Sequence, residues 1–359
     1  MSPISISIIV PTSRAADIAA ETLDSIEGQA SAEDIEVLVV ENGEGSSGFE
    51  DQVSSRGFRY FLEPVKGLLS GRHLGANEAH GEILVYLDDD VILSEAWIQG
   101  VREAFADPET HLATGPSRPR YGGPVPEWLD QFWTKNKDGS RWMGQLSLLD
   151  MGPETKEIRP TLVWGLNYGI RKDTLIQLGG FHPDGVPWEL RRFRGDGETG
   201  LARKAANSKL KATYHPHMAL EHLVPESRLT LEYFERRAYM QGISDSYSDM
   251  RRDQGLYPMP HQGRGSLPRQ KRKARPLWRR VASKVKRSLI GANNRPTNKP
   301  SPSNPEKVVE EISHVQQKYR DGYQYHRDEM EHDPELVKWV LRSDYWDYSY
   351  PEIQQTCLT

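Results

Sequence analysis

The sequence contains a single cysteine, Cys357, and no long apolar run. One thiol excludes an intrachain disulfide and a zinc site built from several cysteines. No apolar stretch approaches the roughly 18 residues that cross a bilayer. The first residues show neither a basic segment nor a small-residue cleavage site, so we expect no signal peptide. These absences favour a soluble protein of a reducing compartment, and we expect a cytoplasmic location.

Charge is distributed unevenly along the chain. The formal net charge of the 359 residues is −5, yet residues 264–287 hold eleven Lys and Arg and no acid. Residues 274–291 place apolar side chains at helical spacing opposite this basic face, which is typical of a helix lying on an anionic membrane surface. A basic linker without regular structure is the alternative. Nucleic acid is not expected as a partner, because no aromatic stacking platform accompanies the charge.

The first 120 residues alternate short β-branched runs with helical patterns. We expect strands at 4–10, 35–40, 58–62 and 83–87, and helices at 15–28 and 68–80. This alternation predicts an α/β fold with a mainly parallel, mixed sheet flanked by helices. Ligands of such sheets bind beyond the carboxyl ends of the strands, so the residues that follow each strand should meet in one crevice.

The later chain is more irregular and richer in proline and tryptophan. We expect a strand at 162–170 and helices at 173–178, 229–242, 308–319 and 334–340. Residues 1–120 and 121–250 are predicted to form two halves of one domain. Residues 251–305 are predicted to be a flexible basic linker, and 306–359 a helical extension that either packs on the domain or mediates dimerisation.

Three carboxylates, Asp88, Asp89 and Asp90, directly follow the buried run ILVYL. Like charges at the end of a buried strand repel each other unless a cation lies between them. Hard cations such as Mg²⁺ and Mn²⁺ prefer oxygen ligands and often share one or two carboxylates with a bound phosphate. The pattern therefore predicts a divalent cation site. A solvated acidic turn before the next helix is the alternative.

Five segments in this order resemble family 2 glycosyltransferases with the GT-A fold: SISIIVPTSR, VLVVENGEG, GLLSGRHLGANEAHGEILVYLDDDV, GLNYGIRKDTLIQLGGFHPD and GDGETGLARKA. The resemblance covers roughly residues 3–245. It implies a nucleotide-diphosphate sugar as donor, a glycan or lipid-linked acceptor, Mn²⁺ or Mg²⁺ as cofactor, and inversion at the anomeric carbon. UDP is the commonest donor nucleotide of the family, with GDP and dTDP as alternatives. Residues 1–120 would bind the donor and 121–250 the acceptor.

The resemblance also implies roles for individual residues. Those expected to bind the nucleotide-sugar are Pro11, Thr12, Arg14, Glu41, Gly67, Arg72, Asp88 and Asp89. Those expected to hold the metal are Asp88, Asp90 and His222. The family more often has Asp where this chain has Glu41, and often Asn where His73 follows Arg72. At each position the alternative is a structural role, as a strand end, a loop acid, a surface cation or a buried histidine.

The reaction needs one carboxylate near the acceptor hydroxyl to take its proton. The family usually has adjacent Glu and Asp before a helix, whereas this chain has Asp196 and Glu198 separated by a glycine. Alignment on the following LARKA makes Glu198 the expected base and Asp196 the alternative. Acids at a helix N-terminus are also favoured without any catalytic role.

Aromatic side chains pack well against sugar rings, so we expect the acceptor to be enclosed by Trp164, Asn167 and Trp188. Burial of these side chains in the core is the alternative. Two other functions remain open. A nucleotidyltransferase that makes the sugar donor would carry a Gly-rich signature after the first strand, where this chain has PTSRAADIAAETLDS. A non-catalytic carbohydrate- or membrane-binding scaffold would tolerate the loss of both acidic clusters. An acceptor linked to lipid would bring the protein to the inner face of the membrane.

Overall fold

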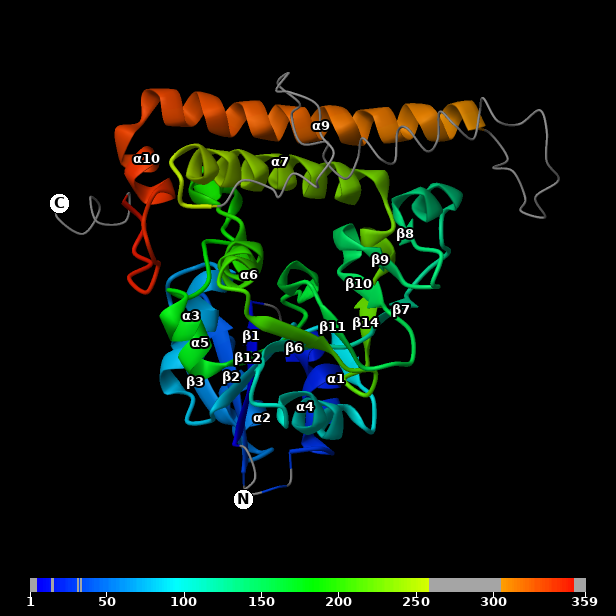
Figure 1. Ribbon diagram of the computed structural model, residues 1–359, viewed down its shortest axis with the longest axis vertical. Helices are drawn as coiled ribbons and strands as arrows, with labels where there is room; N and C mark the ends of the chain where they lie inside the picture. The colour runs from blue at the N-terminus through cyan, green and yellow to red at the C-terminus, as the bar shows by residue number, and fades with distance from the viewer. Residues whose placement is uncertain (1–4, 14–15, 31, 33, 258–304, 352–359) are drawn as a thin grey trace.

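The computed structural model describes residues 5–13, 16–30, 32, 34–257 and 305–351 (Figure 1). The predicted helix at 274–291, most of the predicted linker, and Arg14 lie outside these residues. Within the described residues, no helix is both long enough and apolar enough to cross a membrane.

A large sheet of eight strands forms the centre of the domain, in the order β11-β13-β6-β12-β4-β1-β2-β3. Its strands are β1 (Ile6–Thr12), β2 (Ile35–Asn42), β3 (Arg59–Glu63), β4 (Ile83–Leu87), β6 (Thr110–Thr114), β11 (Lys156–Ile158), β12 (Asn167–Arg171) and β13 (Lys211–Tyr214). Strands β3, β2, β1 and β4 are parallel, whereas β12 runs antiparallel to β4 and β6. The four predicted N-terminal strands are therefore confirmed, as is the mixed character of the sheet.

Helices cover both faces of this sheet, because successive side chains of the central strands are buried on opposite faces. Ile9 and Tyr86 share one core with Leu69, Leu175 and Leu201. The helices that supply these leucines are α3 (Leu68–Glu78), α5 (Lys172–Gln177) and α6 (Gly197–Asn207). The helices that supply the other core are α1 (Ala16–Glu27), α2 (Phe49–Ser54) and α4 (Trp97–Phe105). The predicted fold class is confirmed by this arrangement.

A second sheet of six short strands adjoins the first, in the order β5-β14-β7-β10-β9-β8. Its strands are β5 (Val91–Leu93), β7 (Ser117–Tyr121), β8 (Thr134–Lys135), β9 (Arg141–Met143), β10 (Leu148–Asp150) and β14 (Leu220–Val224). The 3-10 turns are η1 (Glu127–Phe132), η2 (Gly144–Leu146), η3 (Pro160–Leu162), η4 (Trp188–Phe193) and η5 (Glu226–Arg228). The strand predicted at 162–170 begins only at Asn167, because Pro160 starts the turn η3.

Two long helices, α7 (Leu231–Asp253) and α9 (Pro305–His332), lie side by side along one end of the molecule (Figure 1). They approach closely where Gly242 faces Gly322: a Cβ on Gly322 would lie 2.0 Å from the Tyr239 carbonyl oxygen, and one on Gly242 would lie 2.2 Å from the Tyr319 carbonyl oxygen. Only glycine allows two backbones this near to each other. The extension therefore packs on the domain, which was one of the two predicted alternatives.

After the short helix α10 (Pro334–Val340), the chain crosses to the part of the large sheet that contains β3 and is covered by α3. We call residues 344–350 the C-terminal strap. Its Trp346 ring stacks on His73 of α3, with ring centroids 4.2 Å apart. Its Tyr348 hydroxyl donates to Glu63 Oε2 at 2.6 Å. The strap thus joins the far end of the described chain to α3 and to the end of β3.

Candidate functional site

The carboxyl ends of β1, β2 and β4 bring four predicted site residues together. Thr12 and Glu41 are directly paired in the register of β1 and β2. The Thr12 hydroxyl donates to Asp89 Oδ2 at 2.5 Å, and Glu41 accepts from the Tyr60 hydroxyl at 2.8 Å. Pro11 is buried beside them, below α3. These strand ends meet at one edge of the sheet, which is where sheets of this class bind their ligands.

The loop between β3 and α3 follows one of these strands and is held by Asn42, a residue that sequence reasoning did not single out. Asn42 Oδ1 accepts from the Gly67 backbone amide at 2.7 Å, while its Nδ2 donates to the Val65 carbonyl at 2.6 Å. Gly67 has φ of 138°, a conformation that side chains rarely adopt. Gly67 directly precedes α3, and the first backbone amides of a helix have no carbonyl partner within the helix.

The three aspartates occupy different environments. Asp89 and Asp90 are buried, whereas the Asp88 side chain is about one-third exposed, 34%. Burial and repulsion from Asp90 raise the pKa of Asp88 to about 6, with Arg72 acting in the opposite direction. A nearby cation strongly stabilises the ionised form of a carboxylate that is buried beside another negative charge.

His222 lies close to Asp90, although the two come from opposite halves of the chain. Its Nδ1 bonds to the Leu146 carbonyl at 2.8 Å, which directs Nε2 toward Asp90 Oδ1 at 3.5 Å. The Arg228 guanidinium contacts both groups, at 2.9 Å from His222 Nε2 and 2.8 Å from Asp90 Oδ2. Two carboxylates and one imidazole lone pair fit a hard or borderline divalent cation. By ligand type, Asp88, Asp90 and His222 suit Mn²⁺ or Mg²⁺. The structure brings His222 Nε2 to Asp90 Oδ1, whereas Asp88 lies beside Arg72.

Arg72 is buried on α3 and connects the aspartates to the second acidic cluster. Its Nη2 lies 3.9 Å from Asp88 Oδ1, and its Nη1 lies 3.4 Å from Glu198 Oε2. Gly165 makes room for this side chain, since a Cβ there would lie 2.0 Å from Arg72 Nη2. One guanidinium thus lies between a candidate metal ligand and a candidate base.

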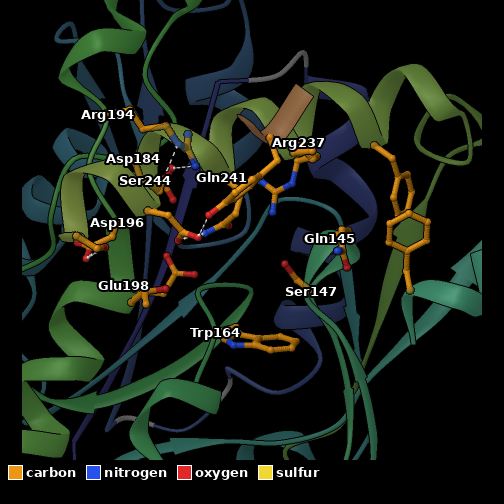
Figure 2. A pocket seen from close by; sticks show the side chains of 18 of the residues that line it. Gln145, Ser147, Trp164, Asp184, Arg194, Asp196, Glu198, Arg237, Gln241 and Ser244 are labelled. Carbon is orange, nitrogen blue, oxygen red and sulfur yellow. Dashed lines mark hydrogen bonds and ion pairs between the residues drawn. The ribbon is translucent and has the colours of Figure 1, made fainter. Parts of the chain in front are cut away.

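Next to Glu198 there is a cavity of about 400 Å³, within the range of small-molecule sites. Figure 2 shows Glu198 and Trp164 on one side, with Arg237 and Gln241 of α7 facing them and Gln145 and Ser147 nearby. Arg194 forms an ion pair with Asp184 at its edge, 2.5 Å apart. The apolar part of the wall consists of Phe132, Phe234, Ala238 and Val315.

Glu198 and Asp196 differ sharply within this wall. The Glu198 side chain is 20% exposed and is held only loosely, by Arg72 and by the Gly165 amide at 3.5 Å. Asp196 is buried and accepts bonds from Arg203 at 2.6 Å, His182 at 2.7 Å and Ser248 at 2.8 Å. Burial alone would raise the pKa of Asp196, but His182, Arg203 and Ser248 hold it well below its usual range. Asp196 is thus a buried carboxylate that accepts bonds from three neighbouring side chains.

The three predicted acceptor residues lie in different places. Trp164 lines the cavity. Asn167 is buried, with Oδ1 accepting from Trp97 Nε1 at 3.2 Å and Nδ2 donating to the Met218 carbonyl at 2.7 Å. Trp188 is 51% exposed and lies against Arg191 and Tyr239, outside the cavity wall. The structure brings only Trp164 to Glu198.

The residues that sequence reasoning missed come mainly from α7 and α9. Arg237, Gln241 and Tyr319 line the cavity but carry no local motif. Arg228 follows β14 and contacts Asp90, a relationship that no spacing rule reveals. The acidic clusters indicated that positive side chains should lie nearby, but the sequence did not indicate which arginines supply them.

Residues 7–158 match the family model described as glycosyl transferase family 2. A curated relative, the glucosyl-dolichyl phosphate glucuronosyltransferase of Haloferax volcanii, is 20% identical over 193 residues. The aligned part is 54% of this chain and 58% of the relative, so the chain spans little more than half of that protein.

Two solved structures are similar at low identity. The mannosyltransferase PcManGT of Pyrobaculum calidifontis, in complex with GDP-Man and Mn²⁺, has a TM-score of 0.49 and 16% identity, covering 97% of this chain and 89% of its own. GalNAc-T7, with UDP, GalNAc and Mn²⁺, has a TM-score of 0.48 and 12% identity, covering 93% and 57%. Since both scores are below 0.5, the assignment depends on the sequence match. The family that the comparisons support is therefore glycosyl transferase family 2, through the match of residues 7–158.

Proposed function

We propose that the protein is an inverting, metal-dependent glycosyltransferase that moves a sugar from a nucleotide diphosphate to an acceptor hydroxyl. The main support is the position of Arg72, whose guanidinium lies 3.9 Å from Asp88 and 3.4 Å from Glu198. A diphosphate held by the aspartates and an acceptor held beside Glu198 would therefore meet at one point. This proximity is what a single displacement requires.

In this proposal the donor occupies the crevice at the ends of β1, β2 and β4. Thr12 and Glu41 bind the nucleoside, and the Gly67 loop together with Arg72 lies against the phosphates. Asp88, Asp90 and His222 would hold Mn²⁺ or Mg²⁺. When bound, such a cation neutralises charge on the departing nucleoside diphosphate. Asp89, through its bond to Thr12, positions the nucleoside end of the crevice.

Glu198 is the proposed base. Its carboxylate accepts the acceptor hydroxyl proton while the oxygen forms a bond to the anomeric carbon, and the bond from that carbon to the phosphate oxygen breaks. Attack opposite the leaving group inverts the anomeric centre. Asp196 instead holds α6, and thereby Glu198, through its bonds to Arg203 and Ser248. Asn167 supports the sheet in this assignment, and Trp164 supplies the aromatic wall.

The acceptor occupies the cavity, whose wall combines arginines with an apolar side. That mixture suits a glycan carrying an anionic group or a lipid-linked glycan. The basic residues 274–291 would then hold the protein at an anionic membrane surface. Residues 1–120 and 121–250 act as the donor and acceptor halves, joined to the extension at 306–359 by the linker at 251–305.

A thermal-shift panel tests the donor site. UDP, GDP and dTDP would each be added with Mn²⁺, Mg²⁺ or a chelator, because a ligand that binds only the folded state raises its melting temperature. We expect one nucleotide diphosphate to stabilise the protein only when a metal is present, and the corresponding nucleotide-sugar to be hydrolysed slowly. Asp90→Ala should abolish both effects. Full hydrolysis by that variant would rule out the metal role.

A further inference from the structure

Two histidines and one glutamate converge far from the cavity. One ligand atom from each of Glu103, His215 and His217 lies within 4.8 Å of the other two. Glu103 belongs to α4, and both histidines belong to the turn between β13 and β14. None of the three lines the cavity, and α4 lies at the opposite end of the molecule from α7 and α9 (Figure 1). The proposed glycosyltransferase reaction makes no use of this cluster.

The backbone of the turn holds the two histidines in place without a bound ligand. The Met218 amide donates to the His215 carbonyl at 3.1 Å, and Pro216 restricts the backbone between the two histidines. The α4 helix packs directly on this turn, since a Cβ on Gly100 would lie 2.8 Å from the His217 Cβ. Glu103 is three residues further along α4, on the same side of the helix.

The distances between the ligand atoms suit a small tetrahedral site. Glu103 Oε2 lies 3.2 Å from His215 Nε2 and 3.0 Å from His217 Nδ1. Zinc bonds of about 2.0–2.2 Å to nitrogen and oxygen place neighbouring tetrahedral ligands roughly 3.3–3.6 Å apart, so binding would need these atoms to separate only slightly. Gln99 donates to the other Glu103 oxygen at 2.7 Å, which orients the carboxylate as outer partners of metal ligands do.

Metal binding requires only a small change in where the ring protons of the two histidines lie. His215 Nδ1 accepts from the His217 amide at 3.3 Å, so in the metal-free form the His215 proton is on Nε2, facing Glu103. A metal replaces that proton, and the ring proton moves to Nδ1, which ends a contact at the long limit of hydrogen bonding. His217 Nδ1 donates to Glu103 Oε2 at 3.0 Å in the metal-free form, so binding a metal through Nδ1 would move that ring proton to Nε2.

We propose that Glu103, His215 and His217 form a second metal site, selective for Zn²⁺ and similar borderline ions. Two imidazoles and one carboxylate favour zinc over Mg²⁺ and Mn²⁺, which prefer oxygen. Exposure of 39% for Glu103 and 51% for His217 leaves the fourth position open to water. The ion would clamp α4 to the turn before β14, the strand that carries His222.

The test uses the full chain, freed of metal with a chelator and then saturated with Mn²⁺ so that the oxygen-rich site is filled. Zn²⁺ is titrated by calorimetry and thermal shift, and Co²⁺ is used as a spectroscopic probe of tetrahedral geometry. The variants are His217→Ala and Glu103→Gln, both at partly exposed positions. His222→Ala and the exposed His80→Ala serve as controls.

We expect one equivalent of Zn²⁺ to bind the parent protein, to raise its melting temperature, and to give the strong visible absorption of tetrahedral Co²⁺. His217→Ala and Glu103→Gln should each weaken Zn²⁺ binding by at least about tenfold, whereas His222→Ala and His80→Ala should retain it. Unchanged zinc binding in His217→Ala and Glu103→Gln would overturn the proposal. The absence of any zinc-dependent stabilisation of the parent protein would also overturn the proposal. Loss of that stabilisation in His222→Ala would do the same.

Discussion

Arg228 lies against Asp90, its Nη2 atom 2.8 Å from Asp90 Oδ2, and the same guanidinium contacts His222 Nε2 at 2.9 Å. The positive group thus contacts two of the three proposed metal ligands. A cation that binds Asp90 and His222 has to displace this guanidinium. Arg228 therefore compensates the Asp90 charge, and it would compete with a metal held by Asp90 and His222 as proposed.

Replacing Arg228 by Gln should raise the affinity for Mn²⁺ in the absence of nucleotide by several-fold, because a competing charge is removed. Isothermal titration with MnCl₂ measures this. His222→Ala is the comparison, and it should weaken Mn²⁺ binding by at least about tenfold. A lower affinity in Arg228→Gln would show that Arg228 does not compete with the metal.

Glu198→Gln and Asp196→Asn should fail in different ways. Loss of the base should lower kcat by about 10²–10⁴-fold while nucleotide binding and the melting temperature stay near those of the parent. Asp196→Asn removes a buried charge from His182 and Arg203, so the free energy of unfolding should fall by roughly 3 kcal/mol. Urea unfolding and initial rates on each variant separate the two. If Asp196→Asn were stable but inactive, Asp196 would be the base and Glu198 would not.

His73 should make the protein less stable in acid. Burial lowers the pKa of His73 to about 3, and the neutral ring uses both nitrogens, accepting from the Phe181 amide at 2.9 Å and bonding to the Tyr345 carbonyl at 3.2 Å. In the unfolded chain a histidine has a pKa of about 6.5. Because the unfolded state then binds the extra proton, the free energy of unfolding falls as pH drops from about 6.5 toward 3.

The measurement is the free energy of unfolding at pH 7 and pH 5, compared between the parent and His73→Gln. Between these values a single histidine accounts for roughly 2 kcal/mol, so the difference should shrink by about that amount in the variant. His80→Gln, at an exposed position, should leave the difference unchanged. If His73→Gln also left it unchanged, the ring would not be neutral in the folded protein.

Gly322→Ala should separate α7 from α9. The new Cβ would lie 2.0 Å from the Tyr239 carbonyl oxygen, a backbone atom that cannot move alone. We expect a loss of roughly 1–3 kcal/mol or more in the free energy of unfolding, measured by chemical denaturation. Gly28→Ala is the matched control, since no atom lies within 4 Å of a Cβ there. Equal stability of the two variants would contradict this close packing.

The sequence predicted correctly those helices and strands whose ends are set by neighbouring residues. β4 spans Ile83–Leu87 as expected, and α10 spans Pro334–Val340, where Asp333 accepts from two helix amides and Pro334 starts the first turn. By contrast, α7 was expected to end at Gly242 but continues to Asp253. That glycine meets α9 instead of ending the helix, and a contact between distant segments leaves no local signal.

The same reason explains which parts of the candidate site were missed. The acids at strand ends follow from the alternation of strands and helices, so Asp88, Asp89 and Asp90 were identified from the sequence. The side chains that complete their surroundings, such as Arg228 and Arg237, come from segments more than a hundred residues away. Their positions depend on how the second sheet and α7 pack, which pattern reasoning does not supply.

The bond from Tyr348 to Glu63 spans 285 positions. At the ordinary pace of translation, on the order of 15–60 s separate the synthesis of these two residues. The end of β3 must therefore wait for its partner until nearly all of this sequence has been made. If the ends of β1, β2 and β4 bind the donor as proposed, a nascent chain would gain this ability only when synthesis of this region has almost finished.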